Sequence, residues 1–103
     1  MVYEIAELQI TPGHEREFEA AVKQAVPLFQ RSAGCLGMKL QRVLEAPGKY
    51  RLVVRWETVE HHMVQFRGSP DFQEWRRLVS PHWVGPPARH HTEMVVEGFG
   101  FPL

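Results

Sequence analysis

The stretch from Val53 to Trp83 constrains the fold most, because its hydrophobic period changes within a few residues from that of a strand to that of a helix. Leu52, Val54 and Trp56 alternate with mostly polar neighbours, which is typical of a strand with one bulky face. Apolar positions then recur at intervals of three and four, at Val59, His62, Met63 and Phe66. We therefore expect a strand that leads directly into a short helix.

A second helix follows without a long loop. Ser69 precedes Pro70, which is the order expected for an N-cap and the first helical residue. Its apolar stripe consists of Phe72, Trp75, Leu78 and Val79. Thr58 is the expected cap of the shorter helix, and Gly68 is expected to end that helix in a left-handed conformation. The second helical unit of the domain is thus predicted to be split in two.

The rest of the chain contains one more helix and three more strands. The predicted elements are strands at 2–10, 35–45, 50–57 and about 88–97, and a helix at about 14–31. Pro27 lies inside the helical pattern and predicts a kink or an early end. The 46–49 segment, Ala-Pro-Gly-Lys, is predicted to form a hairpin turn.

The resulting order, β-α-β-β-α-β, predicts a ferredoxin-like α+β domain: a four-stranded antiparallel sheet with its helices on one face. With 103 residues the chain is long enough for one such domain, which we place at 1–97, followed by a tail at 98–103. Both parities of the strands carry apolar residues, so we expect the sheet face without helices to be buried by a second copy of the chain in a homodimer.

Charge and cysteine content narrow the possible binding partners and the cellular compartment. Lys plus Arg and Asp plus Glu both number 12 and are dispersed, which argues against nucleic acid as a partner. No apolar run approaches the 18 residues of a membrane span, and the first ten residues lack a basic signal region, so no membrane association is expected. Cys35 is the only cysteine, which favours a cytoplasmic protein without an internal disulfide.

From Trp56 onward the sequence WETVEHHMVQFRGSPDFQEWRRLV closely resembles the antibiotic biosynthesis monooxygenase (ABM) family. Shorter matches lie at TPGHEREF after the first strand, at SAGCLG before the second, and at Pro87 to His90, so the resemblance spans about residues 2–97. It implies a dimeric α+β barrel. Members of this family include cofactor-independent oxygenases of polycyclic phenols, quinol oxygenases, haem-degrading enzymes and proteins of unassigned role.

Two histidines are the candidate catalytic residues. His62 lies on the apolar stripe of the short helix, where an imidazole can act as a base near neutral pH. His90 matches a histidine often present in similar proteins and could approach His62 if both border one cavity. His91 points to the opposite face of the strand from His90, and His61 is expected to face solvent.

Four further residues are candidate substrate contacts. Phe66 and Trp75 could line a pocket, and Arg67 and Arg76 could hold an anionic phenolate or carboxylate. For each of the six candidates there is an alternative structural role: a core-edge histidine, a core aromatic residue or a solvated helix arginine.

No cofactor or metal is predicted. The chain has no G-x-G-x-x-G or P-loop motif, no H-x-x-x-H motif and no paired cysteines. The haem-degrading branch of the family uses an Asn, a Trp and a His where this chain has Ala6, Phe66 and Arg76, none of which can ligate haem iron as an imidazole does. Haem degradation is therefore disfavoured, although the nearby imidazole of His62 keeps it from being excluded.

The leading functional hypothesis is a cofactor-independent monooxygenase in which His62 deprotonates a small aromatic or enolisable substrate that then reacts with O₂. One alternative is an isomerase that uses the same base. The other is a non-catalytic dimeric module that binds a small ligand, with the GFGFPL tail docked into a neighbouring chain or closing over the site.

Overall fold

Four antiparallel strands form one sheet in the order β2-β3-β1-β4. The computed structural model describes residues 1–100. The strands are β1 (Val2–Gln9), β2 (Cys35–Arg42), β3 (Lys49–Trp56) and β4 (Ala88–Thr92). The helices are α1 (Glu15–Gln30), the π-helix η1 (His61–Phe66), α2 (Pro70–Val79) and the short 3₁₀ helix η2 (Ser80–His82). This is the predicted ferredoxin-like arrangement, with the second helical unit split.

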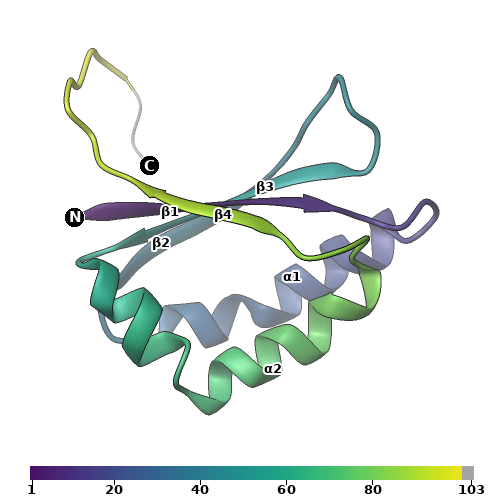
Figure 1. Ribbon diagram of the computed structural model, residues 1–103, viewed down its shortest axis with the longest axis horizontal. Helices are drawn as coiled ribbons and strands as arrows, with labels where there is room; N and C mark the ends of the chain where they lie inside the picture. The colour runs from purple at the N-terminus through teal and green to yellow at the C-terminus, as the bar shows by residue number, and fades with distance from the viewer. Residues whose placement is uncertain (101–103) are drawn as a thin grey trace.

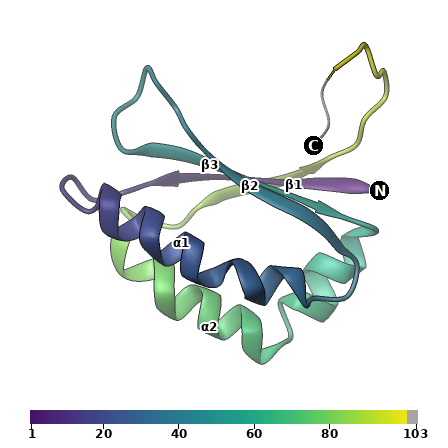
Figure 2. The same cartoon turned by 180° about the vertical axis from the view of Figure 1, so that it is seen from behind.

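Both long helices cover the same face of the sheet, and the other face is left open between two projecting arms (Figures 1 and 2). Apolar side chains from β1, β3, α1 and α2 fill the space between the two layers. The largest that are fully buried are Trp56, Tyr50, Phe18, Phe29, Ile10, Leu52, Val54 and Val79. The hydrophobic core therefore lies on the helix side of the sheet.

The register of β1 and β4 decides which histidine reaches the core side. Glu4 pairs with His91 and Ala6 pairs with Arg89, so these side chains share the face that the helices cover. Ile5 pairs with His90, which therefore lies on the open face. Two neighbouring histidines of one strand are thus separated by the sheet.

The segment after β3 winds as a π-helix, which the sequence pattern did not predict. The Arg67 N–H donates to the carbonyl of His62, five residues back. Thr58 caps the segment as predicted, because its side-chain oxygen accepts from the His61 N–H at 3.2 Å. In the wider turn only His62 and Phe66 of the predicted stripe are buried.

Gly68 follows this segment but is not in the left-handed region, so that prediction was wrong. Glycine is needed there for space, because an added Cβ would lie 2.8 Å from the carbonyl oxygen of Val64. Ser69 caps α2 as predicted and accepts from the Phe72 N–H at 3.3 Å.

The early end expected for α1 at Pro27 is absent, and two strand boundaries differ. α1 passes through Pro27 and ends at Gln30, because burial of Leu28 and Phe29 outweighs the single lost hydrogen bond. β2 ends at Arg42, before the turn that leads to β3. β4 ends at Thr92, opposite Tyr3, because β1 offers hardly any further strand to pair with. The residues that follow Thr92 leave the sheet as an arm, and the last three of the predicted tail lie outside the described residues.

Candidate functional site

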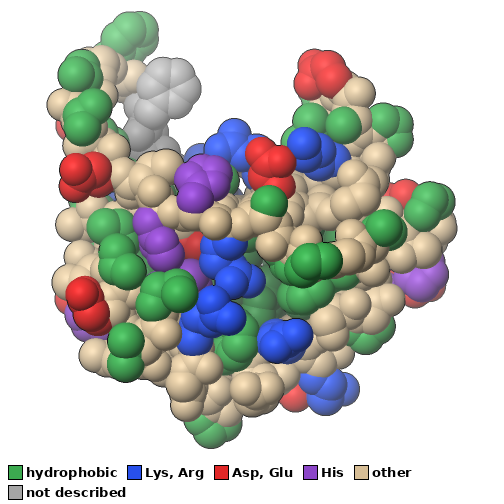
Figure 3. All heavy atoms as spheres, in the orientation of Figure 1, with side chains coloured by type: hydrophobic (Ala, Val, Ile, Leu, Met, Phe, Trp, Pro, Cys, Tyr) green, Lys and Arg blue, Asp and Glu red, His purple; other side chains and the backbone are tan. Residues whose placement is uncertain are grey.

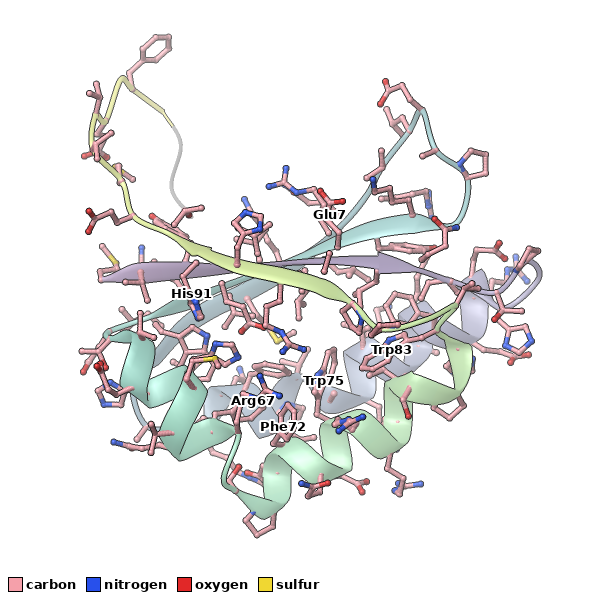
Figure 4. The ribbon with its side chains drawn as sticks, in the orientation of Figure 1. Glu7, Arg67, Phe72, Trp75, Trp83 and His91 are labelled. Atoms are coloured by element: carbon pink, nitrogen blue, oxygen red, sulfur yellow. The ribbon has the colours of Figure 1, made fainter. Side chains whose placement is uncertain are left out.

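A chain of three ionisable side chains crosses the core side of the sheet. His62 Nε2 lies 3.2 Å from Glu4 Oε1, and His62 Nδ1 lies 2.8 Å from His91 Nε2. Glu4 comes from β1, His62 from η1 and His91 from β4. Glu4 is 5% exposed and His62 is 1% exposed, whereas His91 is only half-buried and points from β4 toward the helix layer (Figure 4). His91 is therefore the member that a ligand can reach.

Trp56 fixes the inner end of this chain. Its indole N–H donates to Glu4 Oε1 at 3.1 Å, and its ring stacks on His62 with centroids 5.4 Å apart and planes 17° apart. Arg89 Nε lies 3.7 Å from the other carboxylate oxygen of Glu4. The carboxylate thus faces N–H donors on both oxygens, which is the environment of a hydrogen-bond acceptor.

Burial controls the protonation of the chain. It lowers the pKa of His62 to about 3, and the positive charges of Arg89 and Arg67 and the neighbouring His91 add to this effect. Burial and the charge of Arg89 also lower the pKa of His91. Burial raises the pKa of Glu4, while the Trp56 hydrogen bond and the charge of Arg89 oppose that rise. Both imidazoles are therefore neutral near pH 7.

One tautomer assignment satisfies every contact in the chain. His62 donates from Nε2 to Glu4 and accepts at Nδ1 from the Nε2–H of His91. The Nδ1 atom of His91 then carries a free lone pair. A neutral imidazole oriented by a second group in this way has the form of a general base.

A cleft of about 440 Å³ lies between α2, residues 83–87 and β4, and it reaches the buried group through Arg89, which lies next to Glu4. Its side walls include Arg67, Phe72, Arg76, Trp83 and Arg89. Arg89 and His91 are two residues apart on the same face of β4, a spacing of about 7 Å. Figure 3 shows basic side chains gathered in a hollow below the sheet with histidine beside them, and Figure 4 shows Arg67, Phe72 and Trp83 along it.

The cleft is electropositive and aromatic. The guanidinium groups of Arg67 and Arg76 lie 5.3 and 6.0 Å from the centre of the Phe72 ring. Neither arginine takes part in any ion pair among residues 1–100. Burial lowers the pKa of Arg89, as do the charges of Arg67 and Arg76 nearby. Trp83 Nε1 is buried and has no hydrogen-bond partner among the described residues. The cleft thus offers unpaired donors to an anionic, aromatic ligand.

A hollow of similar volume lies between α1 and β2, but Glu19, the carboxylate in its wall, is already paired. The Tyr50 hydroxyl donates to Glu19, and Arg42 donates to the same carboxylate oxygen. The carboxylate of Glu19 is therefore already engaged by two donors.

The structure distributes the six predicted site residues among four places. His62 lies in the buried chain, and Arg67 and Arg76 line the cleft. Phe66 and Trp75 do not line it: both pack around Phe29 in the core, with ring centroids 4.9 and 5.0 Å from its own. The expected approach of His90 to His62 is wrong, because His90 lies on the open face.

Sequence reasoning missed five residues of the site. They are Glu4, Phe72, Trp83, Arg89 and His91. The alternation of β1 and β4 carries the signal for three of them, since Glu4 shares the parity of Ala6 and Leu8, and Arg89 shares that of His91. Only the strand register, however, identifies which parity of β4 faces the helices.

Fold and site together define a ferredoxin-like domain that has an arginine-lined cleft beside a buried carboxylate–imidazole chain. The protein belongs to the antibiotic biosynthesis monooxygenase family, whose family model matches residues 1–78. The recognition of this family from the sequence is therefore confirmed.

Individual relatives agree with this assignment. A crystal structure from Bordetella bronchiseptica, provisionally described as an antibiotic biosynthesis monooxygenase, is 54% identical, with a TM-score of 0.91 over 92% of this chain and 97% of that one. The uncharacterized Bacillus subtilis protein YczJ is 40% identical over 95 residues, which are 92% of this chain and all of YczJ. A Caulobacter crescentus structure with the same provisional description shares the fold, with a TM-score of 0.81 at 20% identity over 92% of this chain and 90% of that one.

Among the described residues, no helix combines the length and the hydrophobicity required to cross a bilayer.

Proposed function

We propose that this protein is a monooxygenase that oxidises a small, acidic aromatic or enolisable molecule with O₂ and without a bound cofactor. The observation that carries the proposal is the contact of His62 with Glu4 on one side and His91 on the other, next to a cleft lined by three arginines. Membership of the monooxygenase family supports it. The substrate class follows from the chemistry of the cleft.

Each residue has a separate role in this proposal. His91 takes a proton from the substrate, because among Glu4, His62 and His91 it alone is partly exposed. His62, at 1% exposure, does not touch substrate and acts as a positioning residue that presents His91 in its basic tautomer. Arg67, Arg76 and Arg89 hold the resulting anion.

The reaction needs only the substrate and O₂. Proton loss from an activated C–H group leaves a carbanion or phenolate, which transfers one electron to O₂. The substrate radical and superoxide then combine, and loss of water from the hydroperoxide converts CH₂ to C=O. One oxygen atom enters the product and the other leaves as water, so the substrate supplies all the electrons. The protein contributes a base, charge stabilisation of the anion and exclusion of water.

The test is oxygen consumption by metal-stripped protein with anthrones, naphthols and hydroquinones. We expect uptake without any added cofactor, with one O₂ consumed per product molecule. Arg76→Gln should raise KM more than it lowers kcat, because it removes a charge that binds the anion. Arg77→Gln is the matched control, since Arg77 is paired with Glu74 on the surface of α2. If no compound gives uptake but some quench tryptophan fluorescence, the protein is a binding module or an isomerase instead.

We also propose a homodimer. The arm at 93–100 extends past the end of β4, and Val95 and Phe99 on it are 86% and 85% exposed. Arg55 Nε, on the open face of the sheet, is buried without a hydrogen-bond partner among the described residues. Figure 1 shows the arm and the β2–β3 turn standing on either side of that face. A second copy that lies between them would cover the apolar arm and supply an acceptor for Arg55.

Sedimentation velocity tests the dimer. We expect a species of twice the 11.9 kDa chain mass at micromolar concentration and a monomer for the double variant Val95→Asp, Val96→Asp. Val64→Asp is the control, because Val64 is equally apolar and 65% exposed but lies on η1, in the helix layer. A wild-type protein that sediments as a monomer, or a dimer unaffected by the double variant, would contradict this interface.

We place the dimer in the reducing cytoplasm. This setting fits the single free thiol of Cys35, whose pKa burial raises above that of an ordinary cysteine.

A further inference from the structure

Two histidines and a glutamate meet outside the group formed by Glu4, His62 and His91, at the start of α1 and the end of η2. His14 Nδ1 lies 3.1 Å from His82 Nδ1, and the two rings meet edge to face at 66°. Glu17 completes the group, with one ligand atom from each residue within 4.8 Å of the others. None of the proposed catalytic or anion-binding residues belongs to it.

Backbone hydrogen bonds hold the two histidines in place. The His14 N–H donates to the carbonyl of Thr11, and the Thr11 N–H donates to the carbonyl of His82, both at 2.9 Å. The His14 carbonyl accepts from Phe18 in the first turn of α1. These hydrogen bonds fix the two backbone positions from which the imidazoles approach each other, so a ligand would not have to bring the two segments together.

The chemistry of the three groups favours a cation. A hydrogen bond between two Nδ1 atoms uses one lone pair and leaves the carboxylate of Glu17 unused, and Glu17 enters no ion pair among residues 1–100. A tetrahedral zinc ion with Zn–N bonds of about 2.05 Å holds two imidazole nitrogens roughly 3.3 Å apart. The observed separation of 3.1 Å is close to this value. Two imidazoles and one carboxylate are also a donor set that binds borderline divalent ions such as Zn²⁺, Co²⁺ or Ni²⁺.

We propose that His14, Glu17 and His82 bind one divalent transition-metal ion of the zinc type. The ion fastens the start of α1 to the end of the α2–η2 unit. Because Trp83 follows His82 directly and lines the arginine cleft, the metal also stabilises one wall of that cleft. Motif searching misses such a site, since only His14 and Glu17 are close in sequence.

Zinc titration of the metal-stripped protein against a chromogenic chelator tests the proposal. We expect one Zn²⁺ per chain and a rise in Tm on binding, because a ligand specific to the folded state stabilises it. His82→Ala and, as a conservative change on an exposed residue, Glu17→Gln should each weaken binding by about 100-fold or more, since loss of even an outer-shell partner costs 10–100-fold. His61→Ala is the control, because it removes a histidine outside the group.

The readout is metal affinity and Tm, so the result does not depend on any turnover. Circular dichroism establishes that each variant is folded before titration. The absence of saturable zinc binding would overturn the proposal. So would zinc binding that stays the same in folded His82→Ala, His14→Ala and Glu17→Gln.

Discussion

Replacement of His91 by alanine is expected to lower kcat/KM for O₂-dependent turnover by about 10²–10⁴-fold, the usual contribution of a positioned general base. In the proposed reaction, the free Nδ1 of His91 accepts the substrate proton while Nε2 remains bonded to His62 at 2.8 Å. The loss should appear mainly in kcat, because the arginines that bind the anion are intact. Steady-state oxygen consumption over a range of substrate concentrations measures both constants.

His90→Ala is the matched comparison, because it removes an imidazole one residue away on the other face of β4. We expect it to retain turnover, whereas the sequence alone had favoured His90 over His91 as the second catalytic histidine. A large loss in His90→Ala with His91→Ala near wild type would reverse the assignment. Equal, small effects in both variants would remove the histidine base from the mechanism.

The contrast between these two histidines illustrates what the sequence could determine. Period-two alternation showed that His90 and His91 lie on opposite faces, but the face toward the helices depends on the register with β1. Likewise, the helical spacing identified His62 as a candidate, but it did not show how deeply its side chain is buried. The spacing predicted an interior-facing imidazole that acts as a base near neutral pH, whereas the π-helical turn places the ring against Trp56 at 1% exposure.

The fold was more predictable than the site because local signals define its elements. Thr58 and Ser69 mark helix starts through their side-chain oxygens, and both caps are present. The cleft, in contrast, combines residues from α2, η2 and β4 with the loop at 83–87, which carries no periodicity. The pairing of His14 with His82 likewise joins positions 68 residues apart. Contacts of this kind arise only from packing.

The second large effect is expected in the pH dependence of stability, and His62 is its source. In the unfolded chain His62 titrates near its ordinary pKa of 6.5, whereas in the folded protein burial lowers its pKa to about 3. Below pH 6.5 the unfolded state therefore binds the additional proton. The contribution of His62 to stability is fully present above pH 6.5 and is lost as the pH falls toward 3.

For one such group the free energy of unfolding changes by up to about 1.4 kcal/mol per pH unit. His62 should therefore account for a loss of about 2–3 kcal/mol of stability between pH 6.5 and 4. Glu4 acts in the opposite direction, because its raised pKa means that protonation relieves a buried charge as the pH falls. The free energies of unfolding of wild type and His62→Gln should therefore be compared at each pH. The difference between the two free energies at each pH gives the contribution of His62, because the contribution of Glu4 is common to both proteins.

Urea unfolding followed by tryptophan fluorescence supplies these free energies. We expect His62→Gln to be less dependent on pH than wild type between pH 6.5 and 4, so that the two curves converge toward the acid end. Repeating the series at high salt is the control. High salt screens the attraction within surface ion pairs such as Glu7 with Lys49, whereas a pH dependence of stability that arises from burial persists. A constant difference across this range would show that His62 titrates alike in the folded and unfolded states, which would contradict the lowering of its pKa by burial.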